Sequence, residues 1–337
     1  MGMIERENTI ARQIMDFFGD HTPDYGHEIF TNDLGRFETF TLYKGDEFLV
    51  REYRSCYYEN YVMEFITGKS EYIELSFFLG GADVIRDKVN GISGEFKLLH
   101  HYIYFTPGNA DVEIYYEKGI FYKNLDIYVS KDYFHKLAET NPFLQEFIDK
   151  VDREQQGNLF PGGIPITPQM MGILLEIKKC EQEGIYREYF IKSRILSLLL
   201  LIFEFAKDQR HGVEAGSKIS IARYDVQKLM QVREFIEHNL KSFYTIEQLS
   251  LKFGINAFKL KNGFKEMFGE GVFHYASKLR MKEALHLLKN SEYSIKEIAY
   301  QLGYASPSSF TVAFKNEVGL GPSYYRKNPK FSEVTKD

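Results

Sequence analysis

The chain has 337 residues, 44% of them hydrophobic, and a formal net charge of −5, so it is long enough for two domains and has no overall basic charge that would indicate nucleic-acid binding. Its two cysteines, Cys56 and Cys180, lie far apart and form no Cys-x-x-Cys pattern, which argues against a disulfide framework and fits a reducing compartment. The N-terminus lacks an apolar signal core, and the longest apolar run, Leu196–Phe203, is much shorter than the ~20 residues that cross a bilayer, so we expect a cytoplasmic protein without a membrane partner.

The N-terminal part is predicted to consist mainly of short strands. Residues 1–36 are polar, and their apolar residues have the spacing of a short amphipathic helix: Ile10, Ile14, Phe17 and Phe18. After them, short alternating or aromatic runs are separated by Gly, Asp and Asn, which predicts an antiparallel barrel or sandwich. The runs are Phe37–Tyr43, Glu47–Tyr53, Tyr57–Phe65, Tyr72–Leu79, Ala82–Val89, Glu95–Leu99, Tyr102–Thr106, Asp111–Tyr116 and Phe121–Val129. Asn90-Gly91 is the best candidate for a hairpin turn.

The pattern becomes helical after residue 130. Capping residues and prolines predict helices at Ser130–Leu137, Phe143–Val151, Thr167–Cys180 and Tyr186–Lys207. The last helix carries an apolar stripe with 3.6-type spacing, formed by Ile191, Ile195, Leu198, Leu199, Ile202 and Phe203. This stripe is either a dimer surface or ordinary packing against the strand domain. Arg210–Ser220, which contains two glycines, predicts an interdomain linker.

Near the C-terminus one motif occurs twice, at a shift of about 49 to 50 residues. In both copies helical spacing continues on either side of a glycine, which is the sequence pattern of a helix-turn-helix unit. The first copy consists of Thr245-Ile246-Glu247-Gln248-Leu249-Ser250, Gly254-Ile255, Leu260, Phe264-Lys265 and Gly269. The second consists of Ser294-Ile295-Lys296-Glu297-Ile298-Ala299, Gly303-Tyr304, Phe310, Phe314-Lys315 and Gly319. Two such units in tandem predict a protein that enters the major groove of DNA twice.

The spacing and charge of this region support the same interpretation. Asn256–Phe268 and Pro307–Asn316 are the expected recognition helices, and Val272–Lys289 predicts one connecting helix about 27 Å long. From Ser217 to Asp337 the chain has 19 Lys and Arg against 12 Asp and Glu, a net charge of +7, whereas the rest of the chain carries −12. A basic C-terminal third fits attraction of phosphate by one domain only.

The two copies resemble the DNA-binding domain of the AraC family of bacterial transcription regulators. The resemblance includes Arg280, Ala284, Leu287-Leu288 and the ending Gly-x-Gly-Pro-x-x-Tyr-Arg at residues 319–326. It covers about a third of the chain strongly, and it extends weakly to the strands-then-helices layout, which looks like the family's cupin-type effector domain.

The resemblance implies an α+β protein of two domains. Residues 1–209 would form the effector-sensing and dimerisation domain, with an antiparallel, cupin-like β-barrel at about 37–130 and trailing helices at about 130–208. Residues 210–222 would be the linker. Residues 223–330 would form the all-α DNA-binding domain, with two helix-turn-helix units joined by a long helix.

The function implied is sequence-specific transcription regulation by an effector-responsive protein, with activation favoured over repression. The expected partners are double-stranded DNA, a small-molecule effector of unknown identity, RNA polymerase and a second copy of the chain in a homodimer. No cofactor and no catalytic or metal site are expected, and the effector-binding residues stay unassigned.

The expected DNA contacts follow from the outer faces of the helices and from their N-termini. Bases would be contacted by Phe258, Lys259, Lys261, Asn262, Pro307, Ser308, Thr311 and Val312. Phosphates would be contacted by Thr245, Lys265, Ser294, Ser306 and Lys315. The family often has Arg two residues after Leu260 and after Phe310, where this chain has Asn262 and Val312, so we expect fewer guanine contacts and an adenine contact from Asn262.

Two alternatives remain open at this point. One is a β-barrel enzyme that carries a DNA-binding domain, and the other is a regulator controlled by a protein partner. The enzyme is not favoured, because His100-His101 would point to opposite faces of a strand and Gly80-Gly81-Ala82 lacks the residues of a phosphate loop. The aromatic pairs Tyr57-Tyr58, Phe77-Phe78 and Tyr115-Tyr116 either line a ligand pocket or fill a core.

Overall fold

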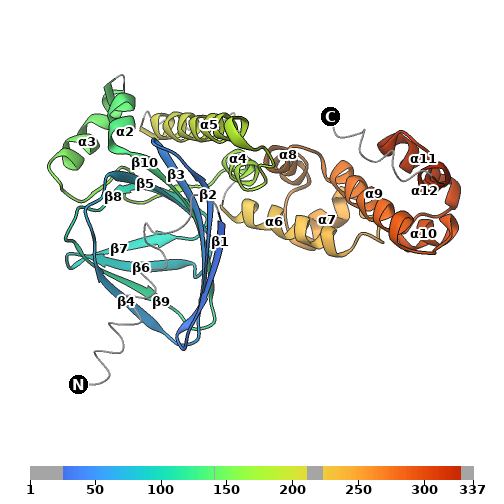
Figure 1. Cartoon of the computed structure of the whole chain (residues 1–337), viewed down its shortest axis with the longest axis horizontal. Helices are drawn as coiled ribbons and strands as arrows, with labels where there is room; N and C mark the ends of the chain where they lie inside the picture. The colour runs from blue at the N-terminus through green and yellow to red at the C-terminus, as the bar shows by residue number, and fades with distance from the viewer. Residues whose placement is uncertain (1–25, 140, 211–222, 328–337) are drawn as a thin grey trace. The chain divides into compact units, whose positions relative to one another are not determined.

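The computed structural model describes residues 26–139, 141–210 and 223–327, and the chain divides into two compact units, Met1–Gly216 and Ser217–Asp337 (Figure 1). The helix predicted around Ile10 and nearly all of the predicted linker lie outside the described residues. Within the described ranges, none of the helices combines the length and the apolar composition that a bilayer crossing requires.

The first unit contains two antiparallel sheets (Figure 1). The larger sheet has the strand order β1-β2-β3-β10-β5-β8-β11, with β12 also paired to β8. Its strands are β1 Gly26–Thr31, β2 Gly35–Lys44, β3 Phe48–Tyr57, β5 Tyr72–Gly80, β8 His100–Phe105, β10 Phe121–Ser130, β11 Gly157–Asn158 and β12 Ile164–Pro165. The smaller sheet has the order β4-β9-β6-β7 and consists of β4 Tyr61–Ile66, β6 Val84–Val89, β7 Ile92–Lys97 and β9 Asp111–Tyr116.

Each of the nine predicted runs overlaps a strand. Asn90-Gly91 forms the predicted two-residue turn between β6 and β7, with φ of 50° and 79°, the left-handed values that this tight hairpin requires. Sequence reasoning missed β1, whose residues had been assigned to the polar N-terminal segment. β1 is an edge strand that alternates half-buried and exposed residues, so it lacks the strong apolar pattern of a central strand.

The predicted barrel is not a single closed sheet, because among the described strands no ladder joins the two sheets. Side chains join them instead. Phe37 and Tyr57 of the larger sheet pack in one buried cluster with Met63 and Ile85 of the smaller sheet. Large aromatic side chains keep two sheets too far apart for backbone hydrogen bonds, as in a sandwich.

The helices of the first unit lie after the strands, as predicted. They are α2 Lys131–Glu139, a 3-10 turn at Pro142–Leu144, α3 Gln145–Asp152, α4 Pro168–Lys178 and α5 Gly184–Arg210. The predicted caps are present: Thr167 accepts a hydrogen bond from Met170 N, and Ser130 accepts one from Tyr133 N. Ion pairs fix α4 and α5 to the sheet, with Lys178 bound to Glu52 and Lys192 bound to Glu47.

The predicted apolar stripe of α5 packs inside the unit. Ile191, Ile195 and Leu198 are fully buried, and α5 contacts α4. Of the two interpretations of this stripe, ordinary packing is therefore correct. A different side of α5 is exposed and carries Tyr186, Tyr189, Leu196 and Leu200.

The second unit is helical. It consists of α6 Arg223–His238, α7 Ile246–Phe253, α8 Ala257–Phe268, α9 Val272–Asn290, α10 Ile295–Gln301, α11 Pro307–Val318 and α12 Pro322–Lys327. Helices are present at both positions expected for recognition, as α8 and α11, and the long connecting helix is present as α9. Each helix pair has its own buried core, centred on Leu260 and Phe264 in the first and on Phe310 and Phe314 in the second.

Candidate nucleic-acid interface and ligand cavity

The first helix-turn-helix unit is formed by α7 and α8. Thr245 closes a capping box on α7, since its hydroxyl accepts from Gln248 N at 3.2 Å and its own N–H donates to Gln248 Oε1 at 2.9 Å. Gly254 ends α7 in the left-handed conformation, with φ 58°, and Asn256 then caps α8 by accepting from Phe258 N. These local signals set the sharp turn between the two helices.

The second helix-turn-helix unit, α10 and α11, repeats this arrangement. Ser294 forms a capping box with Glu297, and Ser306 caps α11 by accepting from Ser309 N at 3.1 Å. Gly303 has φ 83°, and a Cβ at this position would lie only 1.7 Å from the carbonyl oxygen of Lys241. Only glycine therefore fits at Gly303, both for its backbone conformation and for this close approach.

The predicted base-contacting residues differ in exposure. Phe258, Lys261, Ser308 and Val312 are exposed, whereas Lys259, Asn262, Pro307 and Thr311 are partly buried. The four exposed residues lie on the sides of α8 and α11 that face away from the buried residues, which leaves both outer faces open for a ligand. Their contacts with bases remain a prediction.

Two of these residues already have partners within the chain. The Lys259 ammonium lies 2.8 Å from the buried carboxylate of Asp225 on α6. The Thr311 hydroxyl donates to the carbonyl oxygen of Pro307 one turn earlier, at 2.8 Å. Lys259 would have to leave Asp225 to reach a base, so Lys261 and Asn262 are the stronger candidates on α8.

The predicted phosphate contacts also separate into two groups. Lys265 and Lys315 are exposed at equivalent positions of α8 and α11. Thr245 and Ser294 lie at helix N-termini that carry Glu247 and Glu297 in the first turn. Hydrogen bonds from backbone N–H and from the capping hydroxyl hold the pKa of both glutamates below the usual value. These carboxylates compete with phosphate, whereas the first turns of α8 and α11 contain no acidic residue.

Arg280 on α9 connects the two helix-turn-helix units. Its buried guanidinium donates to the carbonyl oxygens of Leu240 at 2.7 Å and Ser242 at 2.8 Å, and it lies 3.8 Å above the Phe243 ring. Phe243 in turn contacts Tyr304 edge to face, with 5.4 Å between the ring centroids. The segment before α7 is thereby held between α9 and the second helix-turn-helix unit. Sequence reasoning assigned Arg280 to the family pattern but gave it no role.

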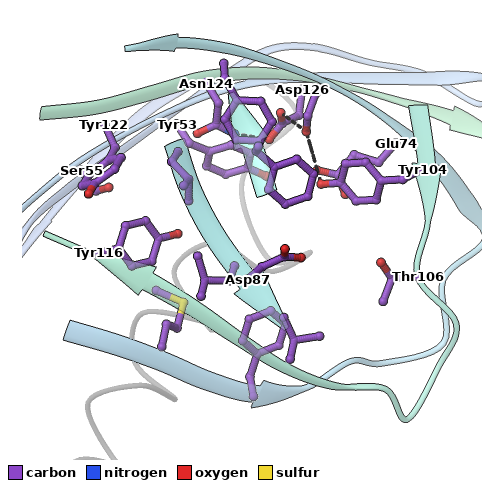
Figure 2. A pocket seen from close by; sticks show the side chains of 18 of the residues that line it. Tyr53, Ser55, Glu74, Asp87, Tyr104, Thr106, Tyr116, Tyr122, Asn124 and Asp126 are labelled. Carbon is purple, nitrogen blue, oxygen red and sulfur yellow. Dashed lines mark hydrogen bonds between the residues drawn. The ribbon is translucent and has the colours of Figure 1, made fainter. Parts of the chain in front are cut away.

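A second candidate site is a cavity of about 380 Å³ in the first unit, lined by residues of both sheets (Figure 2). Of the aromatic pairs singled out in the sequence, Tyr57, Phe78 and Tyr116 line it, while Tyr58, Phe77 and Tyr115 do not. Adjacent residues of a strand point to opposite faces, so one member of each pair faces inward. The volume is in the range of small-molecule sites.

Acidic residues stand on two walls of this cavity. On the larger sheet, the Ser76 hydroxyl lies 3.0 Å from Glu74 Oε1 and 2.6 Å from Asp126 Oδ1, so Glu74 and Asp126 are held close together (Figure 2). Burial raises the pKa of both carboxyls, and for Asp126 the neighbouring charge of Glu74 raises it further. On the smaller sheet, burial raises the pKa of Asp87 to about 6.

Sequence reasoning found no carboxylate cluster and missed these three residues. The one available signal was local: Asp126 stands between the apolar residues Leu125 and Ile127, and the alternation of β6 places Asp87 on the same face as Ile85 and Val89. No local signal tells which strands face each other.

The residue pair His100-His101 does not line this cavity. His101 is buried, has no hydrogen-bond partner and has its pKa lowered to about 3 by burial, while His100 is partly exposed.

Comparisons with known proteins agree with the geometry of the second unit. A family model described as a helix-turn-helix domain matches residues 249–328. The regulatory protein PchR of Pseudomonas aeruginosa is 28% identical over 40% of this chain and 47% of its own length, so the chain spans about half of that relative. An uncharacterised HTH-type transcriptional regulator of Haemophilus influenzae is 26% identical over 69% of this chain and 80% of its own length.

Among solved structures, the DNA-binding domain of AdpA in complex with a target DNA is 22% identical. It covers 32% of this chain and 97% of its own, with a TM-score of 0.30.

Proposed function

We propose that this chain, whose residues 249–328 form an AraC-type helix-turn-helix domain, regulates transcription by binding specific DNA sequences through α8 and α11. The observation that carries this proposal is the repeated arrangement of a capped first helix, a glycine turn and a second helix with an open outer face. The Arg280 contacts and α9 hold the two copies in one relative position. Two recognition helices fixed in this way suit two successive major-groove segments.

Sequence recognition is assigned to exposed and partly buried positions of the two helices. Lys261 and Asn262 on α8, and Ser308, Thr311 and Val312 on α11, would contact base edges. Lys265 and Lys315 would contact phosphate and fix the register without reading the sequence. Asn262 suits adenine, because its amide can pair with adenine N6 and N7, while Val312 suits the thymine methyl group.

The first unit is proposed to be the effector domain, built like a cupin-type fold from two facing sheets. The cavity supports this assignment, because its volume and its mixed polar and aromatic lining are those of a small-molecule site. A ligand that binds one arrangement of the protein better than another would shift the population that binds DNA. Activation through contact with RNA polymerase completes the proposal.

Dimerisation is assigned to the exposed side of α5. Tyr186, Tyr189 and Leu200 on this side are 75%, 66% and 64% exposed, a high exposure for large apolar side chains on one helix. A second copy of the same helix would cover them in a symmetric contact.

The test is an in vitro selection from random duplex DNA with the full chain at stated salt. Two short motifs about one helical turn apart are expected for the wild type. A variant with Lys261, Asn262, Ser308 and Thr311 replaced by alanine should lose them.

The matched control is the pair Lys289→Ala and Asn290→Ala, which removes the same Lys-Asn dipeptide from the exposed end of α9. Enrichment by the control but not by the variant supports the assigned faces. Equal enrichment by all three proteins would show that DNA is bound elsewhere on the chain, and no enrichment even with residues 217–337 alone would overturn the function.

A further inference from the structure

The charged residues that line the cavity are unbalanced. Three carboxyl groups, Glu74, Asp87 and Asp126, line it together with one basic residue, Lys123. The Lys123 ammonium is not free to balance them, because it lies 3.9 Å from Glu52. Glu52 is on the opposite face of β3, where it also pairs with Arg54 and Lys178. The buried Arg51, which is paired in register with Asp126 but does not line the cavity, hydrogen-bonds Tyr53. Among the described lining residues, the acidic groups therefore outnumber the basic ones by three to one.

Asp87 gives the most direct sign of a ligand site. Its side chain points from β6 into the cavity, opposite the wall that bears Asp126 (Figure 2). The residue is 8% exposed, and its Oδ1 atom is buried without a hydrogen-bond partner. An unpaired carboxylate oxygen in such a place costs free energy unless a ligand supplies a donor. Gly94, opposite Asp87 on β7, leaves the space for this carboxylate, since a Cβ there would lie 2.3 Å from Oδ1.

The remaining lining suits a cation that has an apolar body. Tyrosine rings line the wall of the larger sheet, namely Tyr53, Tyr72, Tyr104 and Tyr128, and aromatic faces attract cations. Apolar side chains of the smaller sheet, among them Met63, Val89 and Val112, face the same space. A cavity of about 380 Å³ is far larger than a bare metal ion, and its apolar part could not solvate one.

We propose that the cavity binds a small organic cation, an amine or amidine with an apolar or aromatic body, whose charged nitrogen lies between Asp87 and the Glu74–Asp126 pair. The proposal rests on the assignment of the first unit as the effector domain and adds the chemical class of the effector. The Ser76 hydroxyl carries one proton and contacts both Glu74 and Asp126, so it can donate to only one of them. When no cation is bound, a proton on the other carboxyl would supply the second hydrogen bond. A bound cation would replace that proton and balance the charge of the Asp87 carboxylate.

The test is the melting temperature of the full chain at pH 7.5 with three cations, 2-phenylethylamine, agmatine and spermidine. The matched controls are 2-phenylethanol, phenylacetate and MgCl₂. At least one cation is expected to raise Tm in a saturable way, while the alcohol, the acid and the metal salt leave it unchanged. Titration calorimetry in two buffers of different ionisation enthalpy should show proton release on binding.

Variants assign the effect to the cavity. Asp87→Asn and Glu74→Gln should each weaken the binding of the active cation at least about tenfold, which corresponds to the loss of a charged hydrogen bond. Glu95→Gln, the same carboxylate-to-amide change at an exposed position of β7, should leave it within about twofold. A Tm measured without ligand shows whether each variant is folded, and two independent cavity variants guard against one that is not.

The outcomes separate this inference from the proposed function. Stabilisation by phenylacetate or the alcohol rather than by an amine, equal binding by Asp87→Asn, or no effect of any cation would overturn the inference. Selective DNA binding in the same preparation would leave the regulatory function standing in each of these cases. Cation binding without any DNA selection would instead support the cavity and overturn the regulator.

Discussion

The two units of the molecule differ in how many buried polar atoms they leave without a partner. In the second unit the buried charged residues are matched: Arg280 donates to two carbonyl oxygens, Lys228 to the carbonyl of Gly254, and Asp225 pairs with Lys259. In the first unit Asp87 and His101 keep buried atoms without a partner. Among the described residues of the second unit, only the Nε and Nη2 atoms of Arg326 are buried without a partner. A scaffold that presents an outer surface can satisfy nearly all of its interior. An interior that receives a ligand leaves polar groups unsatisfied until the ligand is present.

Gly303→Ala should produce the largest change and should affect only the second unit. The new Cβ would overlap the Lys241 carbonyl oxygen and would force alanine into φ 83°, so we expect a loss of about 3 kcal/mol or more in the free energy of unfolding. Denaturant unfolding followed by circular dichroism measures it. Gly321→Ala, where a Cβ meets nothing within 4 Å, is the control and should cost less than about 1 kcal/mol. Similar losses for both variants would contradict the close contact.

Arg280→Met tests whether the two helix-turn-helix units depend on one buried guanidinium. Methionine keeps much of the apolar volume but leaves the carbonyl oxygens of Leu240 and Ser242 without their donor, so we expect a loss of about 2 to 4 kcal/mol. DNA affinity should fall for a two-motif site more than for either motif alone. Lys282→Met, at an exposed position of the same helix, should change neither quantity. If Arg280→Met binds the two-motif site with unchanged affinity, the Arg280 contact does not contribute to DNA binding.

Asp87→Asn should stabilise the ligand-free chain, which is the reverse of an ordinary core substitution. The folded pKa of Asp87 is about 6, above the value of 3.8 for a free aspartate, so the folded state binds this proton more tightly than the unfolded state. The free-energy cost of ionising the buried Asp87 carboxyl in the folded state is absent below about pH 4, grows as the pH rises to about 6 and stays constant above it. We expect a gain of at most about 3 kcal/mol at pH 7 to 8 and none at pH 4.

The measurement is the free energy of unfolding of both proteins across this pH range. Because Glu74 and Asp126 titrate in both proteins, the difference between the two curves isolates Asp87. A difference that does not change with pH would show that Asp87 is not strained by its burial.

Asn262→Ala should have the smallest effect, and only on specificity. A bidentate amide–adenine contact contributes about 1 to 3 kcal/mol of discrimination, so the preference at one base position should relax while the chain stays folded. Lys265→Ala should instead weaken binding to all sequences alike and reduce its salt dependence. A base-preference profile that is unchanged by Asn262→Ala would remove this residue from the recognition surface.

Much of the second unit could be predicted because its instructions are local. The Thr245 cap, the Gly254 turn and the buried Leu260 and Phe264 lie within about 20 consecutive residues, and helical spacing relates them directly. The contact between Gly303 and Lys241 was not predictable in the same way, because the two residues are far apart in the sequence. The pairing of Lys259 with Asp225 escaped prediction for the same reason.

In the first unit the sequence predicted most strands but not their arrangement. The alternation in Asp111–Tyr116 gave β9 with its observed bounds, and Asn90-Gly91 gave a turn. That the strands form two sheets rather than a closed barrel depends on which strands pair, and pairing between distant segments leaves no mark in any one of them.

The sequence by itself determined the tandem helix-turn-helix domain, since caps, glycine turns and apolar periodicity act between near neighbours in the chain. The tertiary structure alone brought Glu74, Asp87 and Asp126 from three separate strands to the walls of one cavity. It also decided that the stripe of α5 containing Ile191 and Ile195 is buried and that the side with Tyr186 and Tyr189 is open. The physical reason is that burial and the cost of an unpaired charge are set by the whole packed structure, which no local pattern specifies.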